Sequence, residues 1–257
     1  MREKALKRFG QNFLTDQNVI SNILDILPAN SSCSVLEIGP GKGALTGGLI
    51  ERFRGYIGVD IDPGMISELT AKFPKNKFVN ADILQFNIDD LNISRKIAVV
   101  GNIPYNISTP ILFYLCGNIN RIYSATLMVQ KETALRISAA FGTKDYNASN
   151  VIINNFCELK LHFDVSRNSF TPRPNVDSAV ISLNFGDTVH SLDYIVSYID
   201  IVKSAFTSRR KVLKNSPLNK KYGFANFESL NKYLLKRAEE LSPDDYHFIT
   251  NTILECR

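Results

Sequence analysis

Residues 35–43 read Val-Leu-Glu-Ile-Gly-Pro-Gly-Lys-Gly, an apolar strand pattern that runs into a glycine-rich turn. A helical pattern opens directly afterwards, at residues 44–46. Glycines let the backbone turn tightly and approach a ligand with no Cβ in the way. Two familiar nucleotide loops are excluded: Lys42 has the wrong offset for a P-loop, and Gly43 follows Gly39 by four residues where the dinucleotide fingerprint needs five. An ordinary glycine turn is the alternative.

Two acidic residues follow strand patterns further along the chain. Asp60 ends the second predicted strand, 21 residues after Gly39, an interval at which nucleotide-binding α/β folds place a carboxylate on ribose hydroxyls. Asp82 follows the third predicted strand and is suited to accept a hydrogen bond from an adenine amino group. Each could instead cap a helix or lie in solvent. Asp62 is the better cap candidate, because the next residue, Pro63, suits the first helical position.

Residues 102–105, Asn-Ile-Pro-Tyr, follow an apolar run and one glycine, so we expect them just past the carboxyl end of a buried strand. Open α/β sheets bind their ligands at that edge. The Asn102 side-chain oxygen and a neighbouring backbone carbonyl can accept both hydrogens of an exocyclic amino group, and the Tyr105 ring can stack on a base. A strand end with a proline turn is the alternative for this motif taken alone.

The composition is that of a globular protein with room for one large and one small domain: 257 residues, 44% hydrophobic and 21% charged. The net charge of +5 favours an acidic partner such as nucleic acid. Basic residues concentrate in residues 203–221, which contain seven Lys or Arg and no acidic residue. Surface lysines that only keep the protein in solution are the alternative. A second basic group consists of Arg2, Lys4, Lys7 and Arg8.

The four cysteines and three histidines are dispersed, with no Cys-x-x-Cys spacing, so we expect no metal site. The amino terminus is charged without an apolar stretch, and no run has the length of a membrane span. We therefore expect a cytoplasmic protein that does not bind membranes.

Strand and helix patterns alternate along the first two thirds of the chain, which predicts an α/β fold with a mostly parallel sheet. A proline-rich loop replaces a helix between the last two strands and predicts an antiparallel edge hairpin. The strand signal stops after Gly186, so we expect two domains, 1–188 and an all-α domain at 189–257. The expected strands are 34–38, 56–60, 77–80, 96–100, 124–129, 156–163 and 178–185. The expected helices are 44–52, 63–73, 109–116, 131–140, 192–207, 212–215, 227–237 and 243–254.

The motifs together resemble the KsgA-type (RsmA) family of ribosomal RNA adenine dimethyltransferases along the whole chain. The Glu-x-Gly-x-Gly-x-Gly run is similar to the first motif of class I methyltransferases, and Asn-Ile-Pro-Tyr is similar to the [Asn/Asp/Ser]-Pro-Pro-[Tyr/Phe] motif of amino-methyltransferases. The longest matching stretch is Phe-Thr-Pro-Arg-Pro-Asn-Val-Asp-Ser-Ala-Val at 170–180. The others are residues 8–14, 37–46, 101–110, 128–132 and 208–211.

The resemblance implies a Rossmann-like class I methyltransferase sheet and the cofactor S-adenosyl-L-methionine. The implied cofactor-binding residues are Asn12, Leu14, Gly39, Asp60, Asp82 and Asn102. The implied catalytic residues are Asn102, Pro104, Tyr105 and Phe170. Phe170 is expected to close the face of the adenine opposite Tyr105, and a core aromatic is the alternative. The family usually has Glu where this chain has Asp60, so its ribose contact is expected to be longer or bridged by water.

RNA contacts are expected from residues 1–30 and from the basic run of the helical domain. The candidates in that run are Arg209, Arg210, Lys211 and Lys214. If the first three lie on a helix they fan across roughly 200°, so at least one of them is expected to be structural or solvated.

The implied reaction is dimethylation of N6 of two adjacent adenosines near the 3′ end of 16S ribosomal RNA, in the small ribosomal subunit or its precursor, by a monomeric protein. Positioning is expected to supply most of the acceleration, because the cofactor's sulfonium is already a strong electrophile. Two alternatives stay open: an Erm-type 23S ribosomal RNA methyltransferase that confers antibiotic resistance, and a mainly non-catalytic ribosome assembly factor. The 170–180 stretch and the Arg209-Arg210-Lys211 context favour the first reading, and the intact motifs oppose the last.

Overall fold

The computed structural model describes residues 11–27 and 33–255 of the chain. They form two compact units. The first extends to Ala134 and continues through Leu159–Asp187, and the second consists of Leu135–Glu158 and the residues from Thr188 onward. The sequence pattern had assigned 135–158 to the first domain. The basic residues Arg2, Lys4, Lys7 and Arg8 lie outside the described residues. No helix in the described part of the chain is long and apolar enough to cross a membrane.

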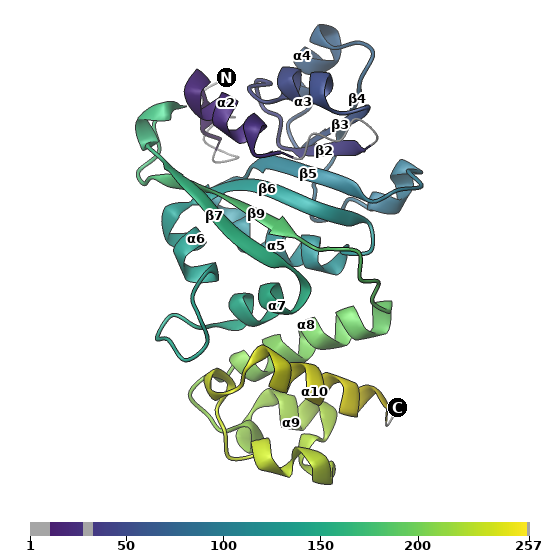
Figure 1. The fold of residues 1–257 in the computed structure, drawn as a ribbon, viewed down its shortest axis with the longest axis vertical. Helices are drawn as coiled ribbons and strands as arrows, with labels where there is room; N and C mark the ends of the chain where they lie inside the picture. Colours follow the sequence, from purple (N-terminus) through teal and green to yellow (C-terminus); the bar gives the residue numbers. More distant parts are fainter. Residues whose placement is uncertain (1–10, 28–32, 256–257) are drawn as a thin grey trace. The chain divides into compact units, whose positions relative to one another are not determined.

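The first unit is built on a seven-stranded sheet in the order β4-β3-β2-β5-β6-β9-β7 (Figure 1). All neighbours from β4 to β6 are parallel, and β9 is antiparallel to β6. The predicted fold class is confirmed: a mostly parallel sheet with antiparallel pairing toward one edge. The strands are β2 (Ser34–Ile38), β3 (Gly55–Asp60), β4 (Lys77–Asn80), β5 (Ile97–Asn102), β6 (Ile122–Gln130), β7 (Glu158–Val165) and β9 (Ser178–Asn184).

Helices connect the strands of the first unit as the periodicity predicted. They are α3 (Thr46–Arg52), α4 (Pro63–Lys72), α5 (Ser108–Gly117) and α6 (Lys131–Ile137), with short 3₁₀ helices η1 (Ile88–Leu91), η2 (Tyr105–Ile107) and η3 (Arg167–Ser169). Asp62 caps α4, accepting a hydrogen bond from the Gly64 amide, as expected from the Asp-Pro sequence. Helices α2 (Gln17–Asp25) and α3 contribute to a common core with β2, β5 and β9, because Ile23, Leu49 and Val100 belong to one buried cluster.

The segment before α2 pairs with a distant part of the chain. Strand β1 (Phe13–Leu14) is antiparallel to β8 (Phe170–Thr171), with Leu14 opposite Phe170. Asp16 caps α2 and also accepts a hydrogen bond from the Ser169 hydroxyl at 3.0 Å. The sequence pattern did not predict β1, α2 or β8. This pairing fixes residues 11–14 beside the carboxyl edge of the main sheet.

The second unit is helical and has a tyrosine-rich core. Tyr146, Tyr198 and Tyr246 are fully buried, and the hydroxyls of Tyr146 and Tyr246 donate to the carbonyls of Leu241 and Ala238. Helices α7, α8 and α10 contact one another. The elements are α7 (Ala148–Phe156), α8 (Leu192–Phe206), η4 (Leu213–Asn215), α9 (Pro217–Tyr222), η5 (Phe224–Asn226), η6 (Glu228–Tyr233), η7 (Ala238–Glu240) and α10 (Pro243–Glu255).

The α-helix predicted at residues 227–237 is wrong, since the structure has only the 3₁₀ helix η6 there. The carbonyls that would continue a helix are used elsewhere: Leu234 accepts from the Lys214 amide and Lys236 accepts from the Leu213 amide. Tertiary hydrogen bonds to η4 therefore override the local apolar spacing.

Candidate functional site

The carboxyl ends of β2, β3 and β5 meet around one cavity of about 220 Å³. Strand β2 lies between β3 and β5 in the sheet: the chain passes from β2 to β3 and β4 on one side and then crosses to β5 on the other. This is the switch point at which open α/β sheets bind ligands. Eight of the predicted site residues line the cavity: Asn12, Leu14, Gly39, Asp60, Asp82, Asn102, Pro104 and Tyr105.

The glycine loop after β2 requires the conformations that glycine permits. Gly39 and Gly41 have φ angles of +65° and +52°, in the left-handed region. A Cβ on Gly41 would lie 3.0 Å from the Phe13 ring. The Gly41 amide donates to the Asp60 carboxylate at 3.1 Å, and the Gly39 amide donates to the Val59 carbonyl at 2.9 Å. The loop is thus tied to the end of β3 and packed against β1.

The Asp60 carboxylate is buried and fixed at the end of β3. One oxygen accepts from the Gly41 amide and the other from the Asp62 amide at 2.9 Å. Burial raises the Asp60 pKa above its ordinary value, although the backbone hydrogen bonds oppose this effect. Asp82 is more exposed, and one of its oxygens accepts from the Leu84 amide at 3.0 Å. Both carboxylates keep lone pairs for a ligand of the cavity.

Asn102 is held in one orientation by the segment before α2. Its amide nitrogen donates to the backbone carbonyl of Asn12 at 3.0 Å, so Oδ1 is the acceptor that the side chain offers to a ligand. The Pro104 carbonyl already accepts from the Ile107 amide at 3.1 Å and from the Ser108 hydroxyl at 3.4 Å. The neighbouring carbonyl predicted as a second acceptor is that of Ile103 or Pro104, and these two bonds leave the Pro104 carbonyl less available for it.

The two predicted stacking aromatics have different surroundings. Tyr105 lines the cavity, half-buried, and its hydroxyl shares a 2.8 Å hydrogen bond with the Ser178 hydroxyl at the start of β9. Phe170 is only 4% exposed, belongs to the buried core cluster that includes Leu14, and does not line the described cavity. Phe170 pairs with Leu14, which lines the cavity, and its stacking on adenine stays a prediction.

Further residues of the cavity had no predicted role. Glu37, at the end of β2, is 2% exposed. Phe13 lines the cavity beside Leu14, and the Lys42 ammonium lies 4.6 Å from its ring centroid. Gln11 also lines it, and its buried Oε1 has no hydrogen-bond partner among the described residues. Phe13 and Gln11 could have been predicted as cavity residues because they are the sequence neighbours of Asn12. Glu37 could have been predicted because it belongs to the glycine motif.

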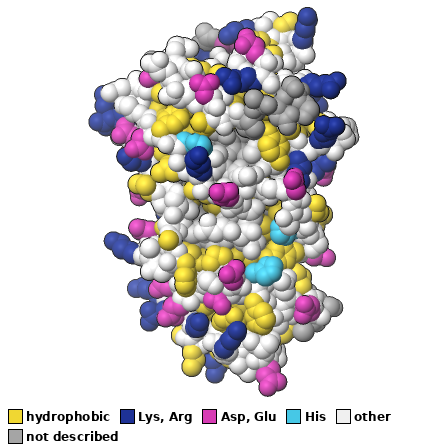
Figure 2. Space-filling model, viewed as in Figure 1, with side chains coloured by type: hydrophobic (Ala, Val, Ile, Leu, Met, Phe, Trp, Pro, Cys, Tyr) yellow, Lys and Arg dark blue, Asp and Glu magenta, His cyan; other side chains and the backbone are white. Residues whose placement is uncertain are grey.

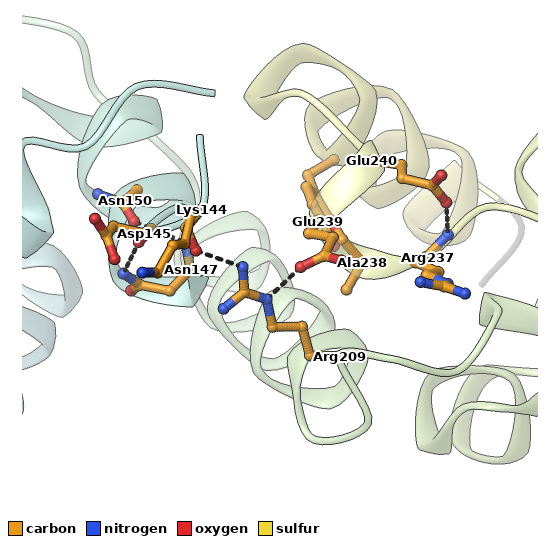
Figure 3. Close-up of polar contacts among 10 residues, drawn as sticks. Lys144, Asp145, Asn147, Asn150, Arg209, Arg237, Ala238, Glu239 and Glu240 are labelled. Carbon is orange, nitrogen blue, oxygen red and sulfur yellow. Dashed lines mark hydrogen bonds and ion pairs between the residues drawn. The ribbon is translucent and has the colours of Figure 1, made fainter. Parts of the chain in front are cut away.

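Helix α8 ends at Phe206, so Arg209 and Arg210 lie in the turn that follows it and Lys211 in a bend, while Lys214 lies in η4. The helical arrangement considered for Arg209, Arg210 and Lys211 is therefore not formed. Arg209 bonds within its own unit: its Nε donates to Glu239 at 2.5 Å and its Nη2 donates to the Lys144 carbonyl at 2.8 Å (Figure 3). Arg210, Lys211 and Lys214 are exposed. Figure 2 shows Lys and Arg side chains dispersed among acidic and hydrophobic ones on the visible face.

The cavity fits a ligand with a nucleoside and a charged amino-acid part. Buried carboxylates suit hydroxyl and ammonium donors, and the exposed apolar side chains of Ile61 and Leu84 suit a base. The buried Gln11 Oε1 accepts no hydrogen bond from the part of the chain that the structure describes. Fold and site together define a class I S-adenosylmethionine-dependent methyltransferase. The family described as "Ribosomal RNA adenine dimethylase" matches residues 2–255, and the chain belongs to this family.

Named relatives cover nearly the whole chain. The ribosomal RNA small subunit methyltransferase A of Chlorobium phaeobacteroides (strain BS1) is 37% identical over 240 residues, covering 93% of this chain and 90% of the relative. The protein of the same name from Saccharophagus degradans is 38% identical over 258 residues, covering 97% and 95%.

Two solved structures of ribosomal RNA or dimethyladenosine methyltransferases are similar to this chain over most of its length. The dimethyladenosine transferase of Plasmodium falciparum has a TM-score of 0.74 at 26% identity, covering 92% of this chain and 95% of that one. The 23S rRNA methyltransferase ErmE has a TM-score of 0.65 at 27% identity, covering 94% and 99%.

Proposed function

We propose that the protein uses S-adenosylmethionine to dimethylate N6 of two adjacent adenosines near the 3′ end of 16S ribosomal RNA, within the small ribosomal subunit or its precursor. Membership of the adenine dimethylase family supports this proposal, as do relatives named for the small subunit. The observation that carries it at the site is the Asn102 amide, fixed by the Asn12 carbonyl at the edge of the cavity. We propose a monomer that acts in the cytoplasm.

Asn102 and Ile103 are the proposed acceptors for the target amino group. The N6 lone pair of adenine is delocalised into the ring, which makes the nitrogen a poor nucleophile. Two acceptors that hold both N6 hydrogens favour a tetrahedral nitrogen and so return the lone pair to it. The bond from Asn102 to the Asn12 carbonyl fixes this acceptor before the base arrives, so little reorganisation is needed.

Tyr105 is the proposed stacking partner for the flipped adenine. Ser178 holds its hydroxyl, which limits rotation of the ring. A base removed from its helix loses stacking energy, and an aromatic face at the pocket restores part of it. Phe170 closes the opposite face only if it leaves its present core position, so we assign it a weaker role than Tyr105.

The residues around the glycine loop would hold the cofactor. Gly39 and Gly41 let the backbone approach it, Asp60 faces ribose hydroxyls, Asp82 accepts from the adenine amino group, and Leu14 supplies apolar contact. When bound, S-adenosylmethionine supplies a methyl group on a sulfonium that needs no further activation. No histidine or cysteine is among the described residues that line the cavity, and the proton released from N6 goes to solvent.

The exposed residues Arg210, Lys211 and Lys214 are the proposed phosphate contacts in the helical unit. Arg209 is removed from this group, because Glu239 and the Lys144 carbonyl already hold its guanidinium. Phosphate contacts position the RNA and set the salt dependence of binding, while base contacts choose the sequence.

An Erm-type activity on 23S ribosomal RNA is the second candidate function. It is supported by the similarity to ErmE over 94% of this chain, with the same sheet and helical unit covered. The cofactor site is common to both candidates, so only the identity of the methylated RNA separates them.

Single-turnover methyl transfer at saturating cofactor tests the role of Asn102. Asn102→Ala should lower the rate by about 10²–10³, because one fixed acceptor at the reacting nitrogen is lost. Asn106→Ala is the matched control, since Asn106 lines the same cavity without an assigned role. Equal rates for the two variants would contradict the proposed acceptor.

A further inference from the structure

Lys42 lies in the glycine loop that follows β2, and the backbone on both sides of it is fixed. The turn that contains it is closed by the Gly43 amide, which donates to the Pro40 carbonyl at 2.8 Å. Its two neighbours, Gly41 and Gly43, have φ angles of +52° and +81°, in the left-handed region that glycine permits. The loop therefore presents the Lys42 side chain from one defined position.

The Lys42 side chain is held against an aromatic ring of the cavity wall. Its ammonium lies 4.6 Å from the centroid of the Phe13 ring, within the range of a cation–π contact. Phe13 is only 8% exposed and is fixed opposite Thr171 by the β1–β8 pairing. Its ring packs on the Gly41 backbone, where an added Cβ would lie 3.0 Å away. Lys42 and Phe13 both line the cavity, so the positive charge is kept at the wall of the ligand site.

Lys42 is the only Lys, Arg or His among the described residues that line the cavity. None of the ion pairs formed within the described part of the chain includes it. Three acidic residues line the same cavity, namely Glu37, Asp60 and Asp82. The wall therefore combines an excess of negative charge with a single cation to which the described residues give no acidic partner.

This distribution of charge suits a ligand that carries charges of both signs. S-adenosylmethionine has an ammonium and a sulfonium, which acidic residues attract, and one carboxylate, which they repel. A lysine ammonium forms short, strong hydrogen bonds with a carboxylate. We infer that Lys42, positioned by the Phe13 ring, binds the carboxylate of the methionine part and so selects S-adenosylmethionine over analogues that lack this group. This inference rests on the proposed function.

The test compares two ligands that differ in this group alone, S-adenosylmethionine and decarboxylated S-adenosylmethionine, by calorimetry with the RNA-free protein. Lys42→Met keeps an unbranched side chain that can contact the Phe13 ring but removes the charge. It should bind S-adenosylmethionine roughly tenfold more weakly, because a hydrogen bond between charged groups is lost. Its affinity for the decarboxylated ligand should be unchanged or higher, since both charges of that ligand are positive. Lys42→Arg, which keeps the charge, should restore the preference for the carboxylate.

Lys72→Met is the matched control variant. Lys72 makes the same kind of contact, with its ammonium 5.2 Å from the centroid of the Phe73 ring, but it does not line the cavity. Its replacement should change the affinity for neither ligand.

Other outcomes would overturn the inference. Equal losses of affinity for the two ligands in Lys42→Met would show that the side chain supports the loop without contacting the carboxylate. Unchanged affinity for both ligands would remove Lys42 from the cofactor site, and weaker binding of ribosomal RNA by the same variant would then make it a phosphate contact. Wild-type protein that binds neither ligand would overturn the proposed function, and this inference with it.

Discussion

At the scale of single residues, the site depends on backbone positions that only glycine fills without strain. Gly39 and Gly41 have positive φ angles at the carboxyl end of β2, where Asp60, Asn102 and the Phe13 ring converge. The loop's amides are bonded to β3, so the ligand meets a surface that is already formed. A side chain at Gly39 would disturb the conformation of this surface rather than the packing of the core.

Gly39→Val should abolish most cofactor binding, because a branched residue at φ +65° is strained and forces the loop to move. Gly47→Ala is the matched control: Gly47 lies in α3 with an ordinary φ and nothing within 4 Å of an added Cβ. That variant should bind cofactor normally and gain up to about 1 kcal/mol of stability. Calorimetry on both folded variants measures the difference, and unchanged affinity in Gly39→Val would remove the loop from the site.

Substitutions of Tyr105 and Phe170 should change different properties of the protein: RNA binding for Tyr105 and stability for Phe170. Tyr105→Ala should cost roughly 1–3 kcal/mol of RNA binding through lost stacking, while Tyr105→Phe, which keeps the ring, should stay close to wild type. Phe170→Ala should instead lower the unfolding free energy by about 3–5 kcal/mol, since the ring is buried in the core. Denaturant unfolding together with RNA titration measures both. A stable Phe170→Ala protein with weakened RNA binding would return Phe170 to the adenine pocket.

The sequence predicted which polar and glycine residues follow the strands, and these make up most of the candidate site. They lie together because parallel strands bring their carboxyl ends to one edge of the sheet. Asn12 and Leu14 could not be placed in this way. Their position follows from the β1–β8 pairing across more than 150 residues of sequence, which no local pattern encodes. The same pairing buries Phe170 behind Leu14. The roles assigned to these residues remain predictions.

At the scale of elements, periodicity predicted the strands and helices of the sheet unit because burial there follows local spacing. Periodicity failed where capping by polar residues or tertiary hydrogen bonds determine the secondary structure. Helix α7 (Ala148–Phe156) was not among the predicted helices; the Asn147–Asn150 capping box starts it and burial of Val151, Ile152 and Ile153 holds it. The helix predicted at 212–215 is only the 3₁₀ helix η4, and Arg209 fixes the turn that precedes it.

Arg209 should matter for the stability of the helical unit. It joins the turn after α8 to η7 and to the segment before α7 (Figure 3). Arg209→Ala should lower the unfolding free energy by about 1–2 kcal/mol, whereas Arg210→Ala, at the exposed neighbour, should change it by less than about 0.5 kcal/mol. Urea unfolding of both variants gives the comparison. If Arg209→Ala and Arg210→Ala were equally stable, the contacts of Arg209 would contribute no more to stability than contacts with water, and Arg209 would again be a candidate for RNA binding.

At the scale of the whole molecule, the chain combines a cofactor-binding sheet unit with a helical unit that carries an exposed basic turn. The strand signal, which stops after Gly186, predicted a sheet part followed by a helical part, but the sequence order could not show that 135–158 belongs with the helical unit. A domain built from two separate segments is defined by contacts among its tyrosines and helices, not by a linker.

The exposed residues Arg210, Lys211 and Lys214 should make the affinity for RNA depend on salt concentration, and they should not affect cofactor binding. Replacing Arg210 and Lys214 together by Ala should weaken small-subunit binding and reduce the slope of log affinity against log salt by roughly one to two units. Cofactor affinity should stay the same, because neither residue lines the cavity. Binding across a salt series provides the test. An unaltered slope would show that these residues are only solvated, and the RNA contacts would then have to be sought at Arg2, Lys4, Lys7 and Arg8.

The most direct measurement of the central claim is transfer of labelled methyl groups from S-adenosylmethionine to isolated small and large ribosomal subunits, with the modified nucleotides mapped. We expect label in the small subunit alone, as N6,N6-dimethyladenosine at two adjacent positions near the 3′ end of its RNA, and strongly slowed labelling with Asn102→Ala. Label in the large-subunit RNA would contradict this account and establish the Erm-type activity. An absence of label in both, with cofactor binding intact, would leave an assembly factor on a methyltransferase fold.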